Sequence, residues 1–245
     1  MTNKEVNVRL TEKANSKPYV ACKPKYDQEY LSKVGRLISK EMRQAKDHPA
    51  CTAKCSTKNG KIKEVLNVST MAGLTCGNCS HCTAWCYEYG YYLRWPSVVQ
   101  NRARNTELLL RDREAFFRSI EDRISRCRYT RYFRWHVGGE ILDEDYLDHM
   151  IQIAKRHPDW VFWTYTKMYH LVNARHDDIP SNLTIMFSQW RGMYCDNPWG
   201  FPIFEVIFPG EEPDENIWQC PGNCDICKAA RRGCPYGESV QNKAH

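Results

Sequence analysis

The second half of the chain alternates short β-branched runs with amphipathic helical segments, and this alternation constrains the fold more than any other feature. Strands are expected at 61–70, 129–137, 160–166, 183–190 and 203–208, and helices at 97–125, 143–157 and 168–175. Strands that alternate with helices imply right-handed βαβ units and a parallel sheet. The strands are too few to close an eight-stranded barrel. We therefore expect an α/β fold, a partial (open) TIM-like barrel of about five to six mainly parallel strands.

The chain divides into three segments by composition. Residues 1–60 are expected to form a basic N-terminal arm, irregular over 1–28, followed by a helix over 29–46. Residues 61–210 hold the α/β core with a cysteine-rich loop at 71–90, and 211–245 form a cysteine-rich, metal-binding C-terminal extension. Ligands are expected at the carboxyl ends of the strands, as in other open α/β sheets.

The chain has thirteen cysteines among its 245 residues, and their expected chemistry depends on the compartment of the protein. No run approaches the roughly 18–20 apolar residues of a membrane span, so an integral membrane protein is not expected. The first residues have no apolar core of a secretory signal, which favours a reducing, cytoplasmic compartment, that of a host cell if the chain is phage-encoded. In such a compartment we expect thiols or metal ligands rather than disulfides.

The first cysteine cluster contains four thiols within eleven residues, directly after a predicted strand. Cys76, Cys79, Cys82 and Cys86 have the spacing of a ferredoxin run, with Tyr87 where proline is usual. Such short spacing lets one loop surround a metal, although in ferredoxins the fourth cysteine serves another cluster. The pattern predicts a metal site and favours iron–sulfur over zinc. The alternative is four reduced, buried thiols that bind nothing.

The second cluster consists of Cys220, Cys224, Cys227 and Cys234. Four thiolates suffice for a closed tetrahedral zinc site or for a cysteine-ligated iron–sulfur cluster. Such a centre has no open coordination position, so its expected role is structural or electron-transferring, and zinc remains an equal alternative here.

A Gly-Gly-Glu sequence ends the second predicted strand and supplies candidate cofactor-binding residues. Gly138 and Gly139 permit a close approach of the backbone to a ligand, and Glu140 would receive an ammonium group. His136 on the preceding strand and Lys167 at the end of the next one complete this candidate set. The alternative is an ordinary tight turn with polar, solvated strand ends.

A strand, a cysteine loop, a helix and a second strand ending in Gly-Gly-Glu resemble the first third of a radical S-adenosylmethionine enzyme. The resemblance implies that Cys76, Cys82 and Cys86 hold a 4Fe-4S cluster and that residues 138–140 contact the amino group of S-adenosylmethionine. The C-terminal cysteines resemble the auxiliary-cluster extensions of that superfamily. On this interpretation the protein is an enzyme of unknown substrate that reduces S-adenosylmethionine to a radical.

Over about residues 65–235 the chain also resembles a phage-encoded family of cysteine-rich gene products, to which no activity is attached. The resemblance is carried by segments 74–76, 81–87, 133–139 and 165–167 and by the C-terminal cysteines.

Two basic stretches support an alternative function. Residues 1–63 carry 15 Lys and Arg against 6 Asp and Glu, and residues 94–134 carry 11 Arg against 5 acids. Such stretches bind phosphate backbones or form solvated helix faces. The alternative is therefore a zinc- or cluster-stabilised nucleic-acid-binding or interaction protein of a phage. The sequence leaves open whether the chain is an enzyme and which oligomeric state it adopts.

Overall fold

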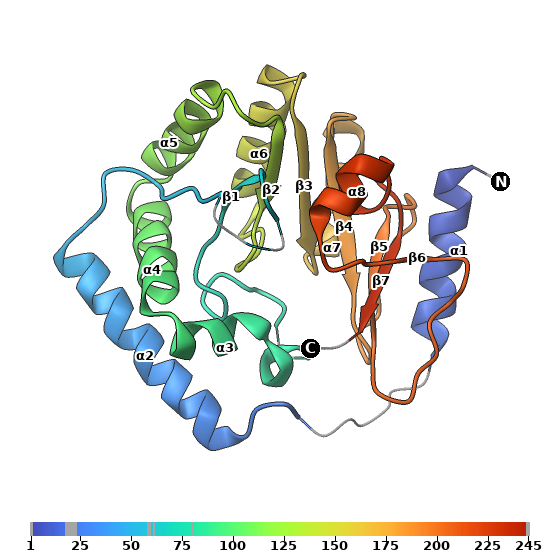
Figure 1. Cartoon of the computed structure of the whole chain (residues 1–245), viewed down its shortest axis with the longest axis horizontal. Helices are drawn as coiled ribbons and strands as arrows, with labels where there is room; N and C mark the ends of the chain where they lie inside the picture. The colour runs from blue at the N-terminus through green and yellow to red at the C-terminus, as the bar shows by residue number, and fades with distance from the viewer. Residues whose placement is uncertain (1, 18–23, 58–59, 61, 80, 244–245) are drawn as a thin grey trace.

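The computed structural model describes residues 2–17, 24–57, 60, 62–79 and 81–243. One open sheet of parallel strands runs through it in the order β1-β2-β3-β4-β5-β7-β6 (Figure 1). The strands are β1 Leu66–Val68, β2 Tyr132–Trp135, β3 Val161–Thr166, β4 Leu183–Gln189, β5 Ile203–Ile207, β6 Trp218–Gln219 and β7 Val240–Lys243. The sheet does not close, which confirms the expected α/β fold with an open, TIM-like arc. The two strands beyond the expected five come from the C-terminal extension.

The helices are α1 Asn3–Ser16, α2 Gln28–Asp47, α3 Tyr87–Arg94, α4 Pro96–Arg111, α5 Arg113–Ser125, α6 Glu144–Arg156, α7 Tyr169–Ala174 and α8 Cys224–Ala230. Short 3-10 turns lie at Thr83–Trp85, His176–Asp178 and Cys234–Tyr236. The single helix expected over 97–125 is wrong, because the chain breaks at Asp112. This residue ends α4 and caps α5, its side chain accepting a hydrogen bond from the backbone of Ala115.

The first residues form a helix, so the irregular arm expected over 1–28 is wrong for this part. The Thr2 side chain accepts from the backbone of Glu5, and the Glu5 side chain accepts from the backbone of Thr2, which makes a capping box. The helix lacks an apolar stripe because the residues it buries include Asn7 and Thr11. The apolar periodicity of the sequence therefore does not predict this helix, whereas Thr2 and Glu5 have the spacing of a capping box and indicate its start. The remainder of the expected arm lies partly outside the described residues.

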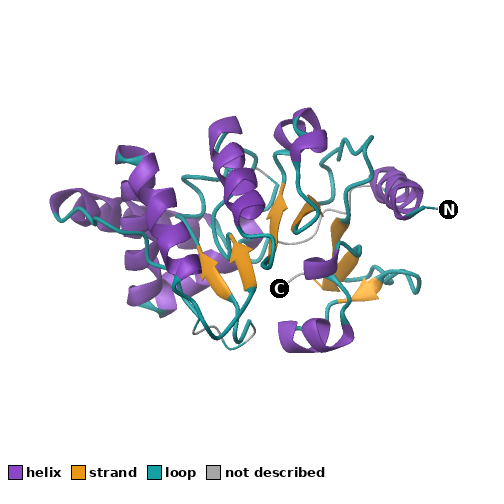
Figure 2. Cartoon of the chain, turned by 90° about the horizontal axis from the view of Figure 1, so that it is seen from above, coloured by secondary structure: helices purple, strands orange, loops and turns teal. Residues whose placement is uncertain are grey.

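The two faces of the sheet are covered by different parts of the chain. On the outer face, residues such as Phe133, Trp135 and Phe162 pack against α4 to α7 in the largest apolar core. On the inner face, Trp163 and Met186 pack with residues of the C-terminal extension. Figure 2 shows the strands as an open arc with the long helices on its outer side. The C-terminal extension therefore fills the inside of the arc.

Helix α2 lies against α4 and α3 on the side of the molecule away from α1 (Figure 1). Its Val34 and Ile38 share a second apolar cluster with Tyr89 and Tyr92 of α3, and Cys76 packs against this cluster. The expected helix over 29–46 is confirmed, and α2 forms one wall around the first cysteine cluster.

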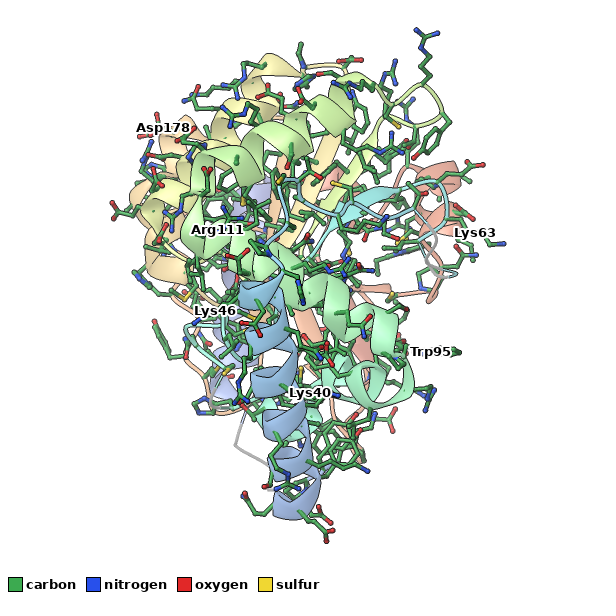
Figure 3. All side chains as sticks on the ribbon, turned by 90° about the vertical axis from the view of Figure 1, so that its left-hand side faces the viewer. Lys40, Lys46, Lys63, Trp95, Arg111 and Asp178 are labelled. Carbon is green, nitrogen blue, oxygen red and sulfur yellow. The ribbon has the colours of Figure 1, made fainter. Side chains whose placement is uncertain are left out.

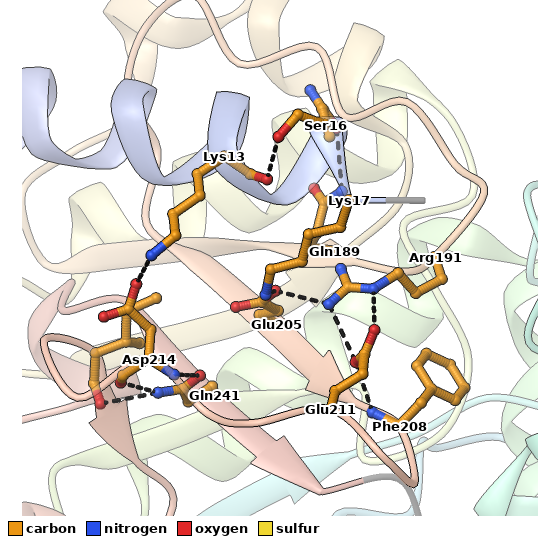
Figure 4. Close-up of polar contacts among 12 residues, drawn as sticks. Lys13, Ser16, Lys17, Gln189, Arg191, Glu205, Phe208, Glu211, Asp214 and Gln241 are labelled. Atoms are coloured by element: carbon orange, nitrogen blue, oxygen red, sulfur yellow. Dashed lines mark hydrogen bonds and ion pairs between the residues drawn. The ribbon is translucent and has the colours of Figure 1, made fainter. Parts of the chain in front are cut away.

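Helix α1 docks on the outer face at β5 through polar contacts (Figure 4). Arg191 and Glu205, each with 2% of its side chain exposed, form an ion pair of 3.2 Å that Lys17 of α1's C-cap joins. Arg191 also binds Glu211 at 2.6 Å. Buried charges are tolerated only when paired, so this network ties the end of α1 to the strand ends of β4 and β5.

We expect Asn7→Ala to lower the free energy of unfolding by about 2 kcal/mol, because it leaves buried polar groups without partners. The Asn7 amide donates to the Gly200 carbonyl at 3.0 Å and accepts from the Ser239 hydroxyl at 2.7 Å. Urea unfolding measures the change, and Glu12→Ala on the exposed face of the same helix is the control. Equal stability of the two variants would contradict the polar docking of α1.

Candidate metal centres at the cysteine clusters

The start of the first cysteine loop is fixed to the Gly-Gly-Glu turn by the residues after β1. The Ser69 hydroxyl accepts from the backbone of Val137 at 3.1 Å and of Gly138 at 3.2 Å. The Thr70 backbone donates to the Gly138 carbonyl at 3.0 Å. These three hydrogen bonds therefore hold the end of β1 against the turn after β2, and the cysteine loop begins directly after them.

The two glycines of the turn are required by neighbouring side chains. A Cβ on Gly138 would stand 2.2 Å from a carboxylate oxygen of Glu88, and one on Gly139 would stand 2.0 Å from the Thr70 hydroxyl. Gly139 also has a φ of +95°, which few other residues adopt. Glu88 is held there by Arg102, whose Nε lies 3.1 Å from it. The space that the sequence suggested for a ligand at these two positions is taken by Glu88 and Thr70.

Glu140 is buried and connects the ends of two strands. One carboxylate oxygen accepts from the backbone of Ile141 at 2.8 Å and the other from the backbone of Lys167 at 2.9 Å. Burial raises the pKa of Glu140, and the nearby Lys167 ammonium opposes this rise. The carboxylate is also near enough to Cys76 and Cys82 to raise the pKa of both thiols. The structure thus brings together Glu140, Lys167 and two cysteines of the first cluster.

The thiols of the first cluster influence one another's pKa but do not converge on a single point. Burial is the largest cause that raises the pKa of Cys76 and Cys86, each to about 12, and charge on neighbouring cysteines adds to it. Cys79 and Cys82 are joined by a tight turn, in which the Cys82 backbone donates to the Cys79 carbonyl at 3.1 Å. Among the residues that the structure describes, no three Cys, His, Asp or Glu side chains are grouped closely enough to hold a metal ion.

Aromatic side chains that follow β4 and β5 cover this loop, and sequence reasoning missed them. Trp85 of the loop meets Phe208 edge to face at 5.6 Å, and Phe208 meets Trp190 at 5.1 Å. The Lys167 ammonium lies 5.8 Å from the centre of the Trp190 ring. The only signal in the sequence was the position of Trp190 and Phe208 at the ends of two predicted strands.

His136 points away from these residues into the outer core. Its Nδ1 lies 3.1 Å from the Thr164 hydroxyl and its Nε2 lies 2.9 Å from the Tyr146 hydroxyl. Burial, with a smaller contribution from Arg134, lowers the pKa of His136 to about 3. The ring is therefore neutral and fully hydrogen-bonded, and the structure does not bring it to Glu140 and Lys167.

The second cluster lies inside the arc of the sheet. Cys220, Cys224 and Cys234 belong to the inner apolar cluster. Burial is the largest cause that raises the pKa of Cys224 and of Cys234, and charge on the other thiols adds to the rise. Cys227 follows on α8, and a Cβ on Gly233 would stand 3.2 Å from its sulfur. Burial raises the pKa of Cys227 and charge on Cys220 adds to the rise, so the four cysteines lie in the same part of the molecule.

The remaining cysteines stay apart from both clusters. Cys127 and Cys195 are buried in the outer core, Cys55 packs at its margin and Cys51 is exposed. The cysteines of the described residues are all free thiols. Cys22 lies outside the described residues.

The basic stretches contribute to two different surfaces. Lys40 and Lys46 are exposed on α2 (Figure 3). Arginines of the second stretch instead pair with acids of the chain itself, as Arg113 does with Asp143 at 2.8 Å and Arg131 with Asp159 at 2.9 Å. Nucleic-acid binding through these stretches stays a prediction. Each helix in the described part of the chain is too short or too polar to span a bilayer.

Comparison with known proteins places the chain in one family. A family model described as Gene product 88 matches residues 39–235 of the 245, which includes both cysteine clusters. No curated protein and no solved structure gave a match. The match agrees with the expected gene-product family. It does not extend to the radical S-adenosylmethionine superfamily, so that resemblance stays a prediction.

We expect the neutral, buried His136 to make the metal-free protein less stable as the pH falls below about 6.5. The unfolded chain then gains a proton that the folded chain cannot accept until about pH 3, and the slope reaches about 1.4 kcal/mol per pH unit. Between pH 7 and pH 5 the parent should lose about 2 kcal/mol more than His136→Asn. Asparagine suits the positive φ of 53° at this position. Urea unfolding with a chelator present tests this, and parallel pH profiles would contradict it.

Proposed function

We propose that this chain, which belongs to the gene product 88 family, is an iron–sulfur protein of the radical S-adenosylmethionine type. One observation carries the proposal: the ends of three successive strands bring two cysteines of the first loop next to Glu140 and Lys167. The carboxyl ends of parallel strands are where α/β folds bind their ligands. The substrate of the enzyme stays open.

Cys76, Cys82 and Cys86 are the proposed ligands of the first centre. Thiolates are the ligands that iron–sulfur clusters require, so the donor set fits the group in chemistry. The three thiols must move closer to one another when a cluster binds. The short turns between them are the part of the loop that can rearrange. A 4Fe-4S cluster held there would have one open iron and would supply the electron that reduces S-adenosylmethionine. Burial raises the pKa of Cys82, and the Lys167 ammonium opposes this rise and favours the thiolate form.

Glu140 is the proposed partner of the amino group of S-adenosylmethionine. Each of its oxygens accepts one backbone hydrogen bond and the Thr166 side chain donates a third, so one of the four lone pairs of the carboxylate remains. The backbone bonds fix the carboxylate between β2 and β3, where an incoming ammonium would find a charged, oriented acceptor. Ser69 and Thr70 hold the turn in place against the cysteine loop. Trp85, Trp190 and Phe208 exclude water from the same edge.

The second centre is proposed to be closed and structural, with Cys220, Cys224, Cys227 and Cys234 around zinc or an iron–sulfur cluster. Its position inside the arc supports this role, because a metal there would stabilise the cover of the inner face. The alternative function, a zinc- or cluster-stabilised nucleic-acid-binding protein, would use α2 and its exposed lysines. Colour of the anaerobically purified protein separates iron–sulfur from zinc, since iron–sulfur protein is brown and zinc protein is colourless.

We expect replacement of Cys76, Cys82 and Cys86 by alanine to remove one cluster's worth of iron and sulfide from the anaerobically reconstituted protein. Iron and sulfide analysis measures the loss. Cys51→Ala, at an exposed position outside both clusters, should keep the iron content of the parent. Unchanged iron in the triple variant would refute the first centre.

We expect Glu140→Gln to weaken binding of S-adenosylmethionine by about ten-fold or more, because a charge-assisted hydrogen bond becomes a neutral one. Glutamine keeps the size of the side chain and one acceptor for the backbone. Calorimetry on cluster-loaded protein measures the affinity, and Glu144→Gln at the start of α6 is the control. If the parent does not bind S-adenosylmethionine, or if Glu140→Gln binds it equally well, only the metal-binding part of the proposal remains.

A further inference from the structure

A cationic side chain without a counter-ion lies beside the C-terminal cysteines. Arg134 is the third residue of β2, and its side chain extends from the inner face of the sheet. Its Nε is buried and has no hydrogen-bond partner in the part of the chain that the structure describes. No carboxylate among those residues forms an ion pair with it. A guanidinium in this position would ordinarily have an anionic partner, because a buried charge without one is costly.

The groups around Arg134 are thiols and phenols rather than carboxylates. Its guanidinium carbon lies 4.7 Å from the centre of the Tyr165 ring. Cys224 and Cys234 are the thiols whose pKa Arg134 lowers, although burial has the larger and opposite effect on both. The electrostatic contacts of Arg134 therefore lead into the second cysteine cluster.

A second buried donor, the indole N–H of Trp218 on β6, faces the same cluster. It lies beside the Cys227 thiol and opposes the rise in the pKa of that thiol that burial causes. Arg232 covers the same ring, with its guanidinium carbon 4.2 Å from the ring centre. Two donors, one on β2 and one on β6, thus border the same cysteines, and the one on β2 has no acceptor.

A metal–thiolate centre is the group that would satisfy Arg134. Four thiolates around Zn²⁺, or around a 4Fe-4S core of charge 2+, carry a net charge of about −2. Thiolate sulfur accepts hydrogen bonds and attracts cations, whereas a protonated thiol is a weak acceptor without charge. Arg134 would then gain the acceptor that it lacks in the metal-free chain, and the indole of Trp218 would face a stronger acceptor than a thiol.

We propose that Arg134 is the counter-ion of a tetrathiolate metal centre formed by Cys220, Cys224, Cys227 and Cys234. The inference rests on the second centre of the proposed function and adds the residue that selects its anionic, metal-bound form. Arg134 is a positioning residue, since it acts on the sulfurs and not on the metal. It explains why a strand of the sheet carries a guanidinium on its inner, aromatic face.

The first test measures zinc affinity on the full, reduced and metal-stripped chain, by competition with a chromophoric chelator. The binding step that disappears in the Cys224→Ala, Cys227→Ala double variant belongs to this centre. Arg134→Met should weaken that step by about ten-fold or more, and Arg134→Lys, which keeps the charge, should weaken it far less. Arg131→Met, which removes a neighbouring guanidinium paired with Asp159, should match the parent.

The second test separates a counter-ion from a merely structural arginine. Without metal, Arg134→Met should melt at or above the temperature of the parent, because an unpaired charge has been removed. With zinc bound, the same variant should melt below the parent. Equal zinc affinity of Arg134→Met and parent, or an equal loss of melting temperature in both forms, would overturn the inference. A parent chain that has no zinc step sensitive to the cysteine variant would overturn the second centre itself.

Discussion

An all-parallel sheet must be covered on both faces, and this requirement explains the arrangement of the remaining chain. The outer face is covered in the usual way by the crossover helices α4 to α7, which are apolar where they meet the strands. At β5 the cover is α1, which docks through amides, hydroxyls and ion pairs instead. In the part of the chain that the structure describes, no crossover helix covers the inner face, and the C-terminal extension with its cysteines supplies that layer.

Most of the fold was predictable because its signals are local. The β-branched runs around Phe162 and Ile185 predict β3 and β4. The acidic residues at the start of 143–157 and the basic residues at its end predict α6. The errors arose where local pattern and tertiary role diverge. Asp112 interrupts an amphipathic run by capping a new helix, and α1 buries polar residues. The C-terminal strands β6 and β7 are only two and four residues long, and pairing rather than propensity makes them strands, since β7 pairs with β5 and β6 pairs with β7.

The candidate site was predictable in its parts and less so in its contacts. Spacing alone identified both cysteine clusters, and parallel topology correctly brought Glu140 and Lys167 to one edge. It did not reveal that Glu88 and Thr70 fill the space beside the two glycines, since neither residue is near that turn in the sequence. Nor did it distinguish His136, which a backbone with positive φ turns into the core, from its neighbours at the strand end.

The bond between Asn7 and Ser239 joins residues 232 positions apart, and this has a consequence for how the chain reaches its native state. Helix α1 finds its docking partners within 195–205 and at Ser239, so it can dock only after these residues have been synthesised. Contacts of such long range close large loops and slow folding. Ser239 also follows shortly after Cys234, so the docking of α1 and the formation of the second cysteine cluster draw on the same late segment of the chain.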